Sequence, residues 1–283
     1  MTASRRRFWG LSLRRRFPLL SRRLSVPDGA AAEPGRAASD VPVLIINLDR
    51  DAARLDAAIA SMAGQPVTVT RIPAVPGLSL PRVASGFIPG AARTESGTLG
   101  CFLSHLRAWE TVVDSTASGA VILEDDAEIR GDLRAAVAIA AGSGADLVFI
   151  NYRMALPQQV DAVAKPTNTV SLGQSLLARA GMDQDACGSD GYYLTRRGAT
   201  ILLDLVERRG VLGDVDWVMV YAALGNAGIA GIRANATAVR CLGQYRHFYN
   251  IGRSLLEAAA LDVPIVYSGA QPSSRLAENG VVT

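Results

Sequence analysis

Lysine is almost absent from this 283-residue chain: Lys165 is the only one, so arginine carries nearly all of the positive charge. Cysteine is also scarce. Cys101, Cys187 and Cys241 are odd in number, far apart and without C-x-x-C spacing, which excludes a zinc knuckle and a redox pair. Reduced thiols in a cytosol are the simplest interpretation, so we expect a cytoplasmic protein.

A long apolar run is missing as well. The mean hydropathy is +0.20, yet no stretch offers the roughly 18 uninterrupted apolar residues of a membrane-spanning helix. The richest stretch, residues 135–150, is interrupted by Gly142, Gly144 and Asp146. Apolar residues make up 49% of the chain, which is enough to fill a core. We therefore expect a protein that at most touches a membrane surface.

Acidic residues are absent before Asp28, whereas three arginine clusters occupy the same segment. We predict a disordered tail and linker over residues 1–40, one domain over 41–255 and an extension over 256–283. Arginine near an anionic headgroup layer contributes about 1 kcal/mol each, so peripheral contact with the inner membrane is one interpretation of the tail. A basic extension without a role is the other interpretation.

No basic face exists elsewhere in the sequence, which argues against the binding of nucleic acid.

Apolar β-branched runs alternate with helical periodicities from residue 41 onward. This alternation predicts an α/β fold: a mostly parallel sheet flanked by helices. After about residue 256 the periodicity is weak, and we expect that segment to cover a surface or to be irregular. The predicted strands are 41–48, 66–75, 120–126, 146–152 and 232–242, and the predicted helices are 49–64, 93–115, 131–142 and 214–228. Residues 191–210 are predicted to form a strand, a turn and a helix in that order.

Three adjacent acids, Glu124, Asp125 and Asp126, end the buried run of the strand predicted at 120–126. Ligands of open α/β sheets bind outside the carboxyl ends of the strands. Side chains alternate along a strand, so Glu124 and Asp126 point one way and Asp125 the other. Hard oxygen ligands suit Mg²⁺ or Mn²⁺ held together with a phosphate-bearing ligand. An acidic turn that only solvates the strand end remains the alternative.

Glycine-rich phosphate loops are missing: there is no Walker motif and no G-x-G-x-x-G after the first strand. A bound diphosphate would then be held by a metal ion and by arginine, whose forked guanidinium suits phosphate oxygens. Arg50 and Arg54 follow the first predicted strand, and Asn47 lies at its end. We include these three residues in the predicted ligand-binding set; solvated helix-face arginines are the alternative.

Several blocks resemble family 25 glycosyltransferases, which include bacterial lipooligosaccharide galactosyltransferases and relatives of the collagen galactosyltransferases. The resemblance covers residues 41–250. It is carried by VLIINLDRDAARLDAAIASM, VTRIPAV, GTLGCFLSHLRAWETVV and AVILEDDAEI, and further on by GSDGYYLTRRGATILL and DVDW.

The resemblance implies a GT-A-like fold and inverting, Mn²⁺- or Mg²⁺-dependent transfer of a hexose, with galactose the commonest, from a UDP-sugar. The implied acceptor is a saccharide of a cell-surface glycolipid such as lipopolysaccharide or lipooligosaccharide. A catalytically silent nucleotide-sugar or glycan-binding module on the same fold is the alternative.

The resemblance also implies roles for individual residues. Asp126 is the expected direct metal ligand, and Glu124 contacts the metal or the ribose. Asp216 is the first candidate for the catalytic base, with Asp190 and Asp214 behind it; a helix N-cap would also explain Asp214. The remaining implied positions are His105 near the nucleotide, His247 as a further metal ligand, and Tyr192, Tyr193 and Trp217 as stacking residues, against core or loop positions for each.

Overall fold

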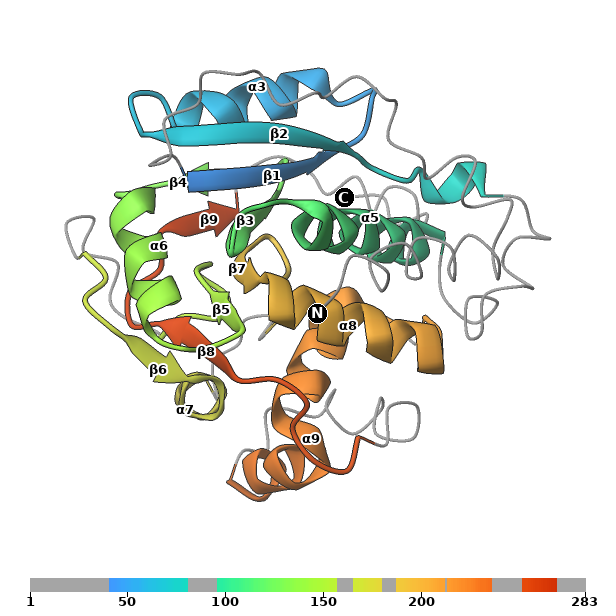
Figure 1. The fold of residues 1–283 in the computed structure, drawn as a ribbon, viewed down its shortest axis with the longest axis vertical. Coiled ribbons are helices and arrows are strands. Elements are labelled where there is room, and N and C mark those ends of the chain that lie inside the picture. Colours follow the sequence, from blue (N-terminus) through green and yellow to red (C-terminus); the bar gives the residue numbers. More distant parts are fainter. Residues whose placement is uncertain are drawn as a thin grey trace.

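The computed structural model describes residues 41–80, 96–156, 165–179, 187–211, 213–235 and 251–268. Figure 1 shows helices packed around a twisted sheet. The arginine-rich residues 1–40 lie outside the described residues, so the expected tail, its membrane contact and the division into parts stay predictions. The bounds of the first half are β1 (Val41–Asn47), α3 (Ala52–Ser61), β2 (Val67–Pro73), η1 (Gly77–Ser79), α5 (Ser96–Asp114), β3 (Gly119–Glu124) and β4 (Ala127–Ile129).

The second half continues the alternation of strands and helices. Its bounds are α6 (Leu133–Gly142), β5 (Leu147–Phe149), β6 (Thr169–Ser171), α7 (Leu172–Ala178), β7 (Gly191–Thr195), α8 (Arg196–Arg209), α9 (Val215–Asn235), β8 (Ala258–Leu261) and β9 (Val266–Ser268).

Seven strands form the main sheet in the order β2-β1-β3-β7-β5-β8-β6, and β4 pairs with β9 in a second, two-stranded sheet. β1 runs parallel to β2 and β3, and β5 runs parallel to β8. β7 lies antiparallel between β3 and β5, and β6 is antiparallel to β8. The predicted mostly parallel sheet flanked by helices is confirmed.

The reversed strand β7 decides which residues meet at the functional edge. We call the edge at which β1, β3 and β5 end the carboxyl edge. Because β7 runs the other way, its beginning lies there: Gly191 pairs with Leu123, and the Glu124 amide donates to the Asp190 carbonyl at 3.2 Å. Residues just before β7 therefore join the strand-end acids.

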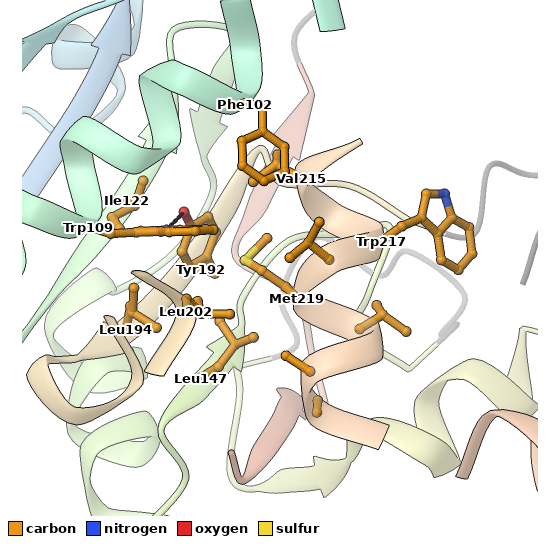
Figure 2. Close-up of a cluster of buried hydrophobic side chains, with 14 of the residues drawn as sticks. Phe102, Trp109, Ile122, Leu147, Tyr192, Leu194, Leu202, Val215, Trp217 and Met219 are labelled. Atoms are coloured by element: carbon orange, nitrogen blue, oxygen red, sulfur yellow. Dashed lines mark hydrogen bonds between the residues drawn. The ribbon is translucent and has the colours of Figure 1, made fainter. Parts of the chain in front are cut away.

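Two apolar clusters cover the two faces of the sheet. Side chains alternate along β1, so Val43 and Ile45 join the cluster with α3 and α6, whereas Leu44 and Ile46 join the cluster with α5, α8 and α9. In Figure 1, α5 lies beside α8. Figure 2 shows the second cluster, in which side chains of α5, α8 and α9 meet those of β3, β5 and β7.

α9 is the one described helix that is long and apolar enough to cross a membrane, over Val215–Ile232. Of that window, 67% is buried inside the protein, as expected of a core helix. Gly225 interrupts the helix with φ 60° and ψ 179°. A side chain there would also meet the backbone of Arg253 and Ser254, at 2.5 and 2.7 Å, so this position requires glycine on two counts.

Two expectations about the C-terminal third are wrong. Ile232–Asn235 continues α9 and is not part of a strand; residues 236–242 of that predicted strand lie outside the described residues. The segment after 256 does not merely cover a surface. β8, with the sequence AAAL, lies between β5 and β6 in the main sheet. Three successive alanines lack the β-branched side chains that favour strands, so β8 is recognised only from its burial between the neighbouring strands.

Candidate active site

Glu124, the last residue of β3, lies beside the buried polar side chains of His105 and Ser189 at the carboxyl edge. Its Oε1 accepts a hydrogen bond from Ser189 Oγ at 2.6 Å and lies 3.5 Å from Nε2 of His105. Burial favours the neutral acid, but His105, Ser189 and the charge of Arg153 outweigh it and lower the pKa of Glu124 to about 2. Glu124 is therefore a carboxylate at every physiological pH.

His105 is fully buried in α5, and its orientation is fixed by a chain of hydrogen bonds. Trp109 Nε1 donates to the Tyr192 hydroxyl at 2.8 Å, as the dashed line in Figure 2 shows. The hydroxyl lies 2.8 Å from Nδ1 of His105. Since indole can only donate, the Tyr192 hydroxyl accepts from Trp109 and can donate its own hydrogen to Nδ1 when the ring proton of His105 is on Nε2, facing Glu124. Tyr192 is thus a core residue.

Replacing Tyr192 by Phe is expected to destabilise the protein by about 2–3 kcal/mol, because a buried indole N–H loses its acceptor and His105 its donor. Chemical denaturation measures this change in the free energy of unfolding. Tyr193→Phe is the matched control: it lies one position along in β7 on the other face, and its hydroxyl makes no hydrogen bond to a described residue. Equal effects of the two substitutions would contradict the hydrogen-bonded chain.

Asp125 and Asp126 follow the last residue of β3 in a turn, so the expected strand alternation does not hold for them, and both carboxylates lie beside Arg54. Asp125 Oδ2 accepts from Asn47 Nδ2 at 2.8 Å, and Arg54 Nη2 lies 2.5 Å from Asp125 Oδ1. Asn47 is oriented in turn by Arg71, whose Nε donates to Asn47 Oδ1 at 2.9 Å. Burial raises the pKa of Asp125 in spite of these partners. The structure thus places Asn47 and Arg54 beside the acids and engages both with Asp125, while their predicted role in ligand binding stays a prediction.

Asp126 has the least satisfied carboxylate of the three. Its side chain is only 16% exposed, and Arg54 Nη2 lies 3.6 Å from Oδ2. Oδ1 is buried and makes no hydrogen bond to any described residue. Burial and the negative charges of Glu124 and Asp190 raise the pKa of Asp126 to about 7. A buried carboxylate oxygen without a partner, among further acids, fits a hard divalent cation such as Mn²⁺ or Mg²⁺.

Asp190, the residue directly before β7, connects three segments through its side-chain contacts. It is completely buried. Its Oδ1 accepts from Asn151 Nδ2 at 2.5 Å, and its Oδ2 accepts from Ser268 Oγ at 2.7 Å. Arg153 Nη2 lies 3.4 Å from Oδ1. The carboxylate thus joins the end of β5, the start of β7 and the end of β9.

Sequence reasoning missed Asn151, Arg153, Ser189 and Ser268. The first two had a usable signal, since Asn151 lies near the end of the strand predicted at 146–152 and Arg153 directly follows that strand, much as the acids end theirs. Ser189 and Ser268 had none: their places depend on the direction of β7 and on the pairing of β9 with β4.

Asp216 is the second residue of α9 and is 8% exposed. Its Oδ1 accepts from the amide of Trp217 at 2.8 Å. Its charge acts on Arg153 together with those of Asp190 and Glu124, which places it in the same electrostatic cluster. Asp214 precedes the helix, and its carbonyl accepts from the Val218 amide at 3.2 Å, the position of an N-cap.

Two of the predicted site residues, Arg50 and His247, are not linked to the acids of the site by any described contact. The Arg50 side chain is 51% exposed, and its Nε lies 3.8 Å from Oδ2 of Asp51. His247 lies outside the described residues, so its predicted role as a metal ligand stays a prediction.

A different metal-compatible group is formed by Cys101, His105 and Glu124, whose ligand atoms lie within 4.8 Å of one another. A proton on Nε2 of His105 would make this group less suited to a cation than the carboxylates around Asp126.

Fold and site together define an α/β enzyme whose polar site lies outside the carboxyl ends of its parallel strands. The chain belongs to glycosyltransferase family 25 (LPS biosynthesis protein), whose family model matches residues 40–219. The resemblance found in the sequence is confirmed. Membership makes the protein a glycosyltransferase.

Three solved structures are similar to this chain at low identity. An apo structure of the WbbM bifunctional glycosyltransferase is 10% identical with a TM-score of 0.40, over 84% of this chain and 47% of that one, so the chain spans about half of it. An active-site mutant of LgtC is 13% identical with a TM-score of 0.36, over 82% and 88%. GlyE of Streptococcus pneumoniae TIGR4 is 9% identical with a TM-score of 0.35, over 84% and 56%. No curated protein matches the chain.

Proposed function

We propose that this glycosyltransferase moves a hexose, galactose before glucose, from a UDP-sugar to a saccharide of a lipopolysaccharide-type acceptor, with inversion and with Mn²⁺. The observation that carries the proposal is Asp126: a buried carboxylate with a partnerless oxygen, beside Glu124 and Asp190 at the carboxyl edge. Such a site gains stability from a cation and, through it, from a diphosphate. The acceptor class is supported by the family description.

Asp126 would hold the cation, with Glu124 as the second carboxylate of the site. Bound there, Mn²⁺ would supply electrostatic stabilisation of the negative charge that develops on the departing diphosphate. The protein prepares the site in advance. Ser189 and His105 keep Glu124 ionised, while Asn47 and Arg54 fix Asp125 and so the turn that carries Asp126.

Inversion requires a base that accepts the proton of the attacking acceptor hydroxyl from within about 3 Å. Asp216 suits this role better than Asp190. Both oxygens of Asp190 already accept short hydrogen bonds, and the residue is completely buried. Asp216 lies at the beginning of α9, in the same cluster of charges but away from the β7 start.

A donor screen tests the proposed function. The purified protein is incubated with UDP-galactose, UDP-glucose and their GDP counterparts, with Mn²⁺ or with EDTA, and sugar release is followed. We expect cleavage of a UDP-hexose in Mn²⁺ and at least a 100-fold loss in EDTA, because the leaving group then loses its counter-charge. Release of the β-anomer from an α-linked donor, observed by NMR before mutarotation, would report inversion.

The alternative of a catalytically silent module makes the opposite prediction. Calorimetry would then show UDP or glycan binding while no donor is cleaved under any condition. Cleavage that is fully retained in EDTA would overturn the metal-dependent mechanism but not the transferase assignment.

We also propose a cytoplasmic location with peripheral contact to the inner membrane through residues 1–40, which rests on composition alone.

A further inference from the structure

Arg153 is a cation surrounded by acids that do not use up its hydrogen-bonding capacity. Its ion-pair contact among the described residues is 3.4 Å long, from Nη2 to Asp190 Oδ1. Asp190 takes its short hydrogen bonds from Asn151 and Ser268 instead. Nε of Arg153 is buried and has no hydrogen-bond partner among the described residues. A guanidinium has five donors in a fixed fork, so most of that fork is still available to a ligand.

The charge of Arg153 is secured by its surroundings. Burial alone would lower the pKa of the guanidinium, but the charges of Asp190, Glu124, Asp216 and Asp126 outweigh burial and hold the pKa above its ordinary value. Arg153 therefore stays a full cation within the acid cluster. It also keeps mutually repelling carboxylates together before any ligand arrives.

The backbone before β7 packs closely against the Arg153 side chain. A Cβ atom at Gly188 would collide with the guanidinium of Arg153, meeting Nε and lying 2.5 Å from Cζ. The Gly188 carbonyl is held in place by Asn151 Nδ2 at 2.8 Å. Glycine therefore lets the chain lie directly on one side of the guanidinium, while 32% of the side chain stays exposed.

The two arginines predicted to hold a diphosphate are less suited to it. Arg54 Nη2 is engaged with Asp125 at 2.5 Å, and Arg50 is half exposed beside Asp51. Arg153, by contrast, is packed closely by its neighbours, is positively charged and is partly exposed to solvent. It lies next to the carboxylates proposed to hold the cation.

We propose that Arg153 binds the diphosphate of the sugar donor and stabilises it as it departs, an assignment that rests on the proposed function. The bond between the anomeric carbon and the β-phosphate oxygen breaks, and its electron pair stays on that oxygen. The acceptor oxygen forms the new bond to the anomeric carbon, and its proton passes to a carboxylate of the site. Arg153 donates hydrogen bonds to the diphosphate, whose oxygens match its fork.

Calorimetry with UDP and with uridine tests this assignment in Arg153→Gln, Arg153→Lys and an Arg134→Gln control, which removes the same charge from the exposed face of α6. For Arg153→Gln we expect UDP affinity to fall about 10- to 100-fold while uridine binding is unchanged, because only UDP carries phosphate. Arg153→Lys should fall between, since it keeps the charge and loses the fork. The control should match the unaltered protein.

Mn²⁺ binding without nucleotide separates a diphosphate role from a purely structural one. Removing a cation from among the acids should tighten Mn²⁺ binding by about threefold or more in Arg153→Gln. A structural role predicts that Mn²⁺, uridine and UDP all bind more weakly. That result, or unchanged UDP affinity, would overturn the assignment while leaving the proposed function intact. Absence of UDP binding by the unaltered protein would overturn both.

Discussion

Asp126→Asn is expected to abolish donor cleavage, by about 1,000-fold or more, and at the same time to stabilise the metal-free protein at pH 8. The loss of activity follows from the loss of the carboxylate proposed to hold the cation. The stabilisation follows from the cost of keeping that carboxylate ionised. Burial and the charges of Glu124 and Asp190 raise the pKa of Asp126 to about 7, whereas an aspartate in the unfolded chain has its ordinary pKa near 3.9.

The sign of the pH dependence is determined by that difference in pKa. Below pH 4 Asp126 is protonated in both states, and its ionisation costs the fold nothing. Between pH 4 and 7 the unfolded state releases the proton first, so the folded state loses stability, by roughly 2–4 kcal/mol once the pH exceeds 7. Asn cannot ionise, so the variant should gain that amount at pH 8 and gain nothing at pH 3.5.

Thermal and chemical denaturation at the two pH values measure this effect. Asp56→Asn, on the exposed face of α3, is the matched control and should leave both activity and stability unchanged. Mn²⁺ should raise the melting temperature of the unaltered protein at pH 8, by mass action on the folded state, and not that of Asp126→Asn. A variant that is less stable than the unaltered protein at pH 8 would show that Asp126 has a partner the described contacts do not include.

Asp216→Asn is expected to reduce turnover about 100- to 10,000-fold, the usual contribution of a positioned general base. Its donor and Mn²⁺ affinities should be unchanged, because the proposed role begins only when the acceptor hydroxyl attacks. Steady-state kinetics with a saccharide acceptor, together with UDP calorimetry, separate the two quantities.

Two neighbouring aspartates serve as controls for Asp216. Asp214→Asn should keep full turnover, because asparagine is also a good N-cap. Asp190→Asn should lose folding stability, since an amide cannot accept on both sides from Asn151 and Ser268. Loss of donor binding in Asp216→Asn, or normal turnover, would remove Asp216 from the role of base.

Local patterns accounted for most of the fold. Strand β1 alternates between the two apolar clusters, and α3, α5, α6 and α8 begin and end near the predicted residues. The family resemblance is confirmed by the match over residues 40–219. Predictions failed at Ile232–Asn235 and at Ala258–Leu261. There, four residues of a predicted strand lie in a helix and an alanine run lies in a sheet, because tertiary packing outweighs weak local preferences.

The candidate site likewise has one part that the sequence predicts and one part that only the structure shows. A strand-end rule was enough to place Glu124, Asp125 and Asp126 at the carboxyl edge and to bring Asn47 and Arg54 near them. It was not enough to tell that Asp125 is engaged with Asn47 and Arg54 while Asp126 keeps a partnerless oxygen. Burial and charge around each carboxylate depend on side chains from distant segments.

Periodicity, apolar strand content and the abrupt end of β3 in acids are local properties, so the amino-acid sequence alone determined the α/β class and the edge at which the chemistry lies. The direction of β7 and the places of Arg153, Ser189 and Ser268 arise from contacts between residues as far as 78 positions apart, such as Ser268 with Asp190. Such contacts depend on how the strands are ordered in space, and only the tertiary structure decided which acids are satisfied and which one remains available to a cation.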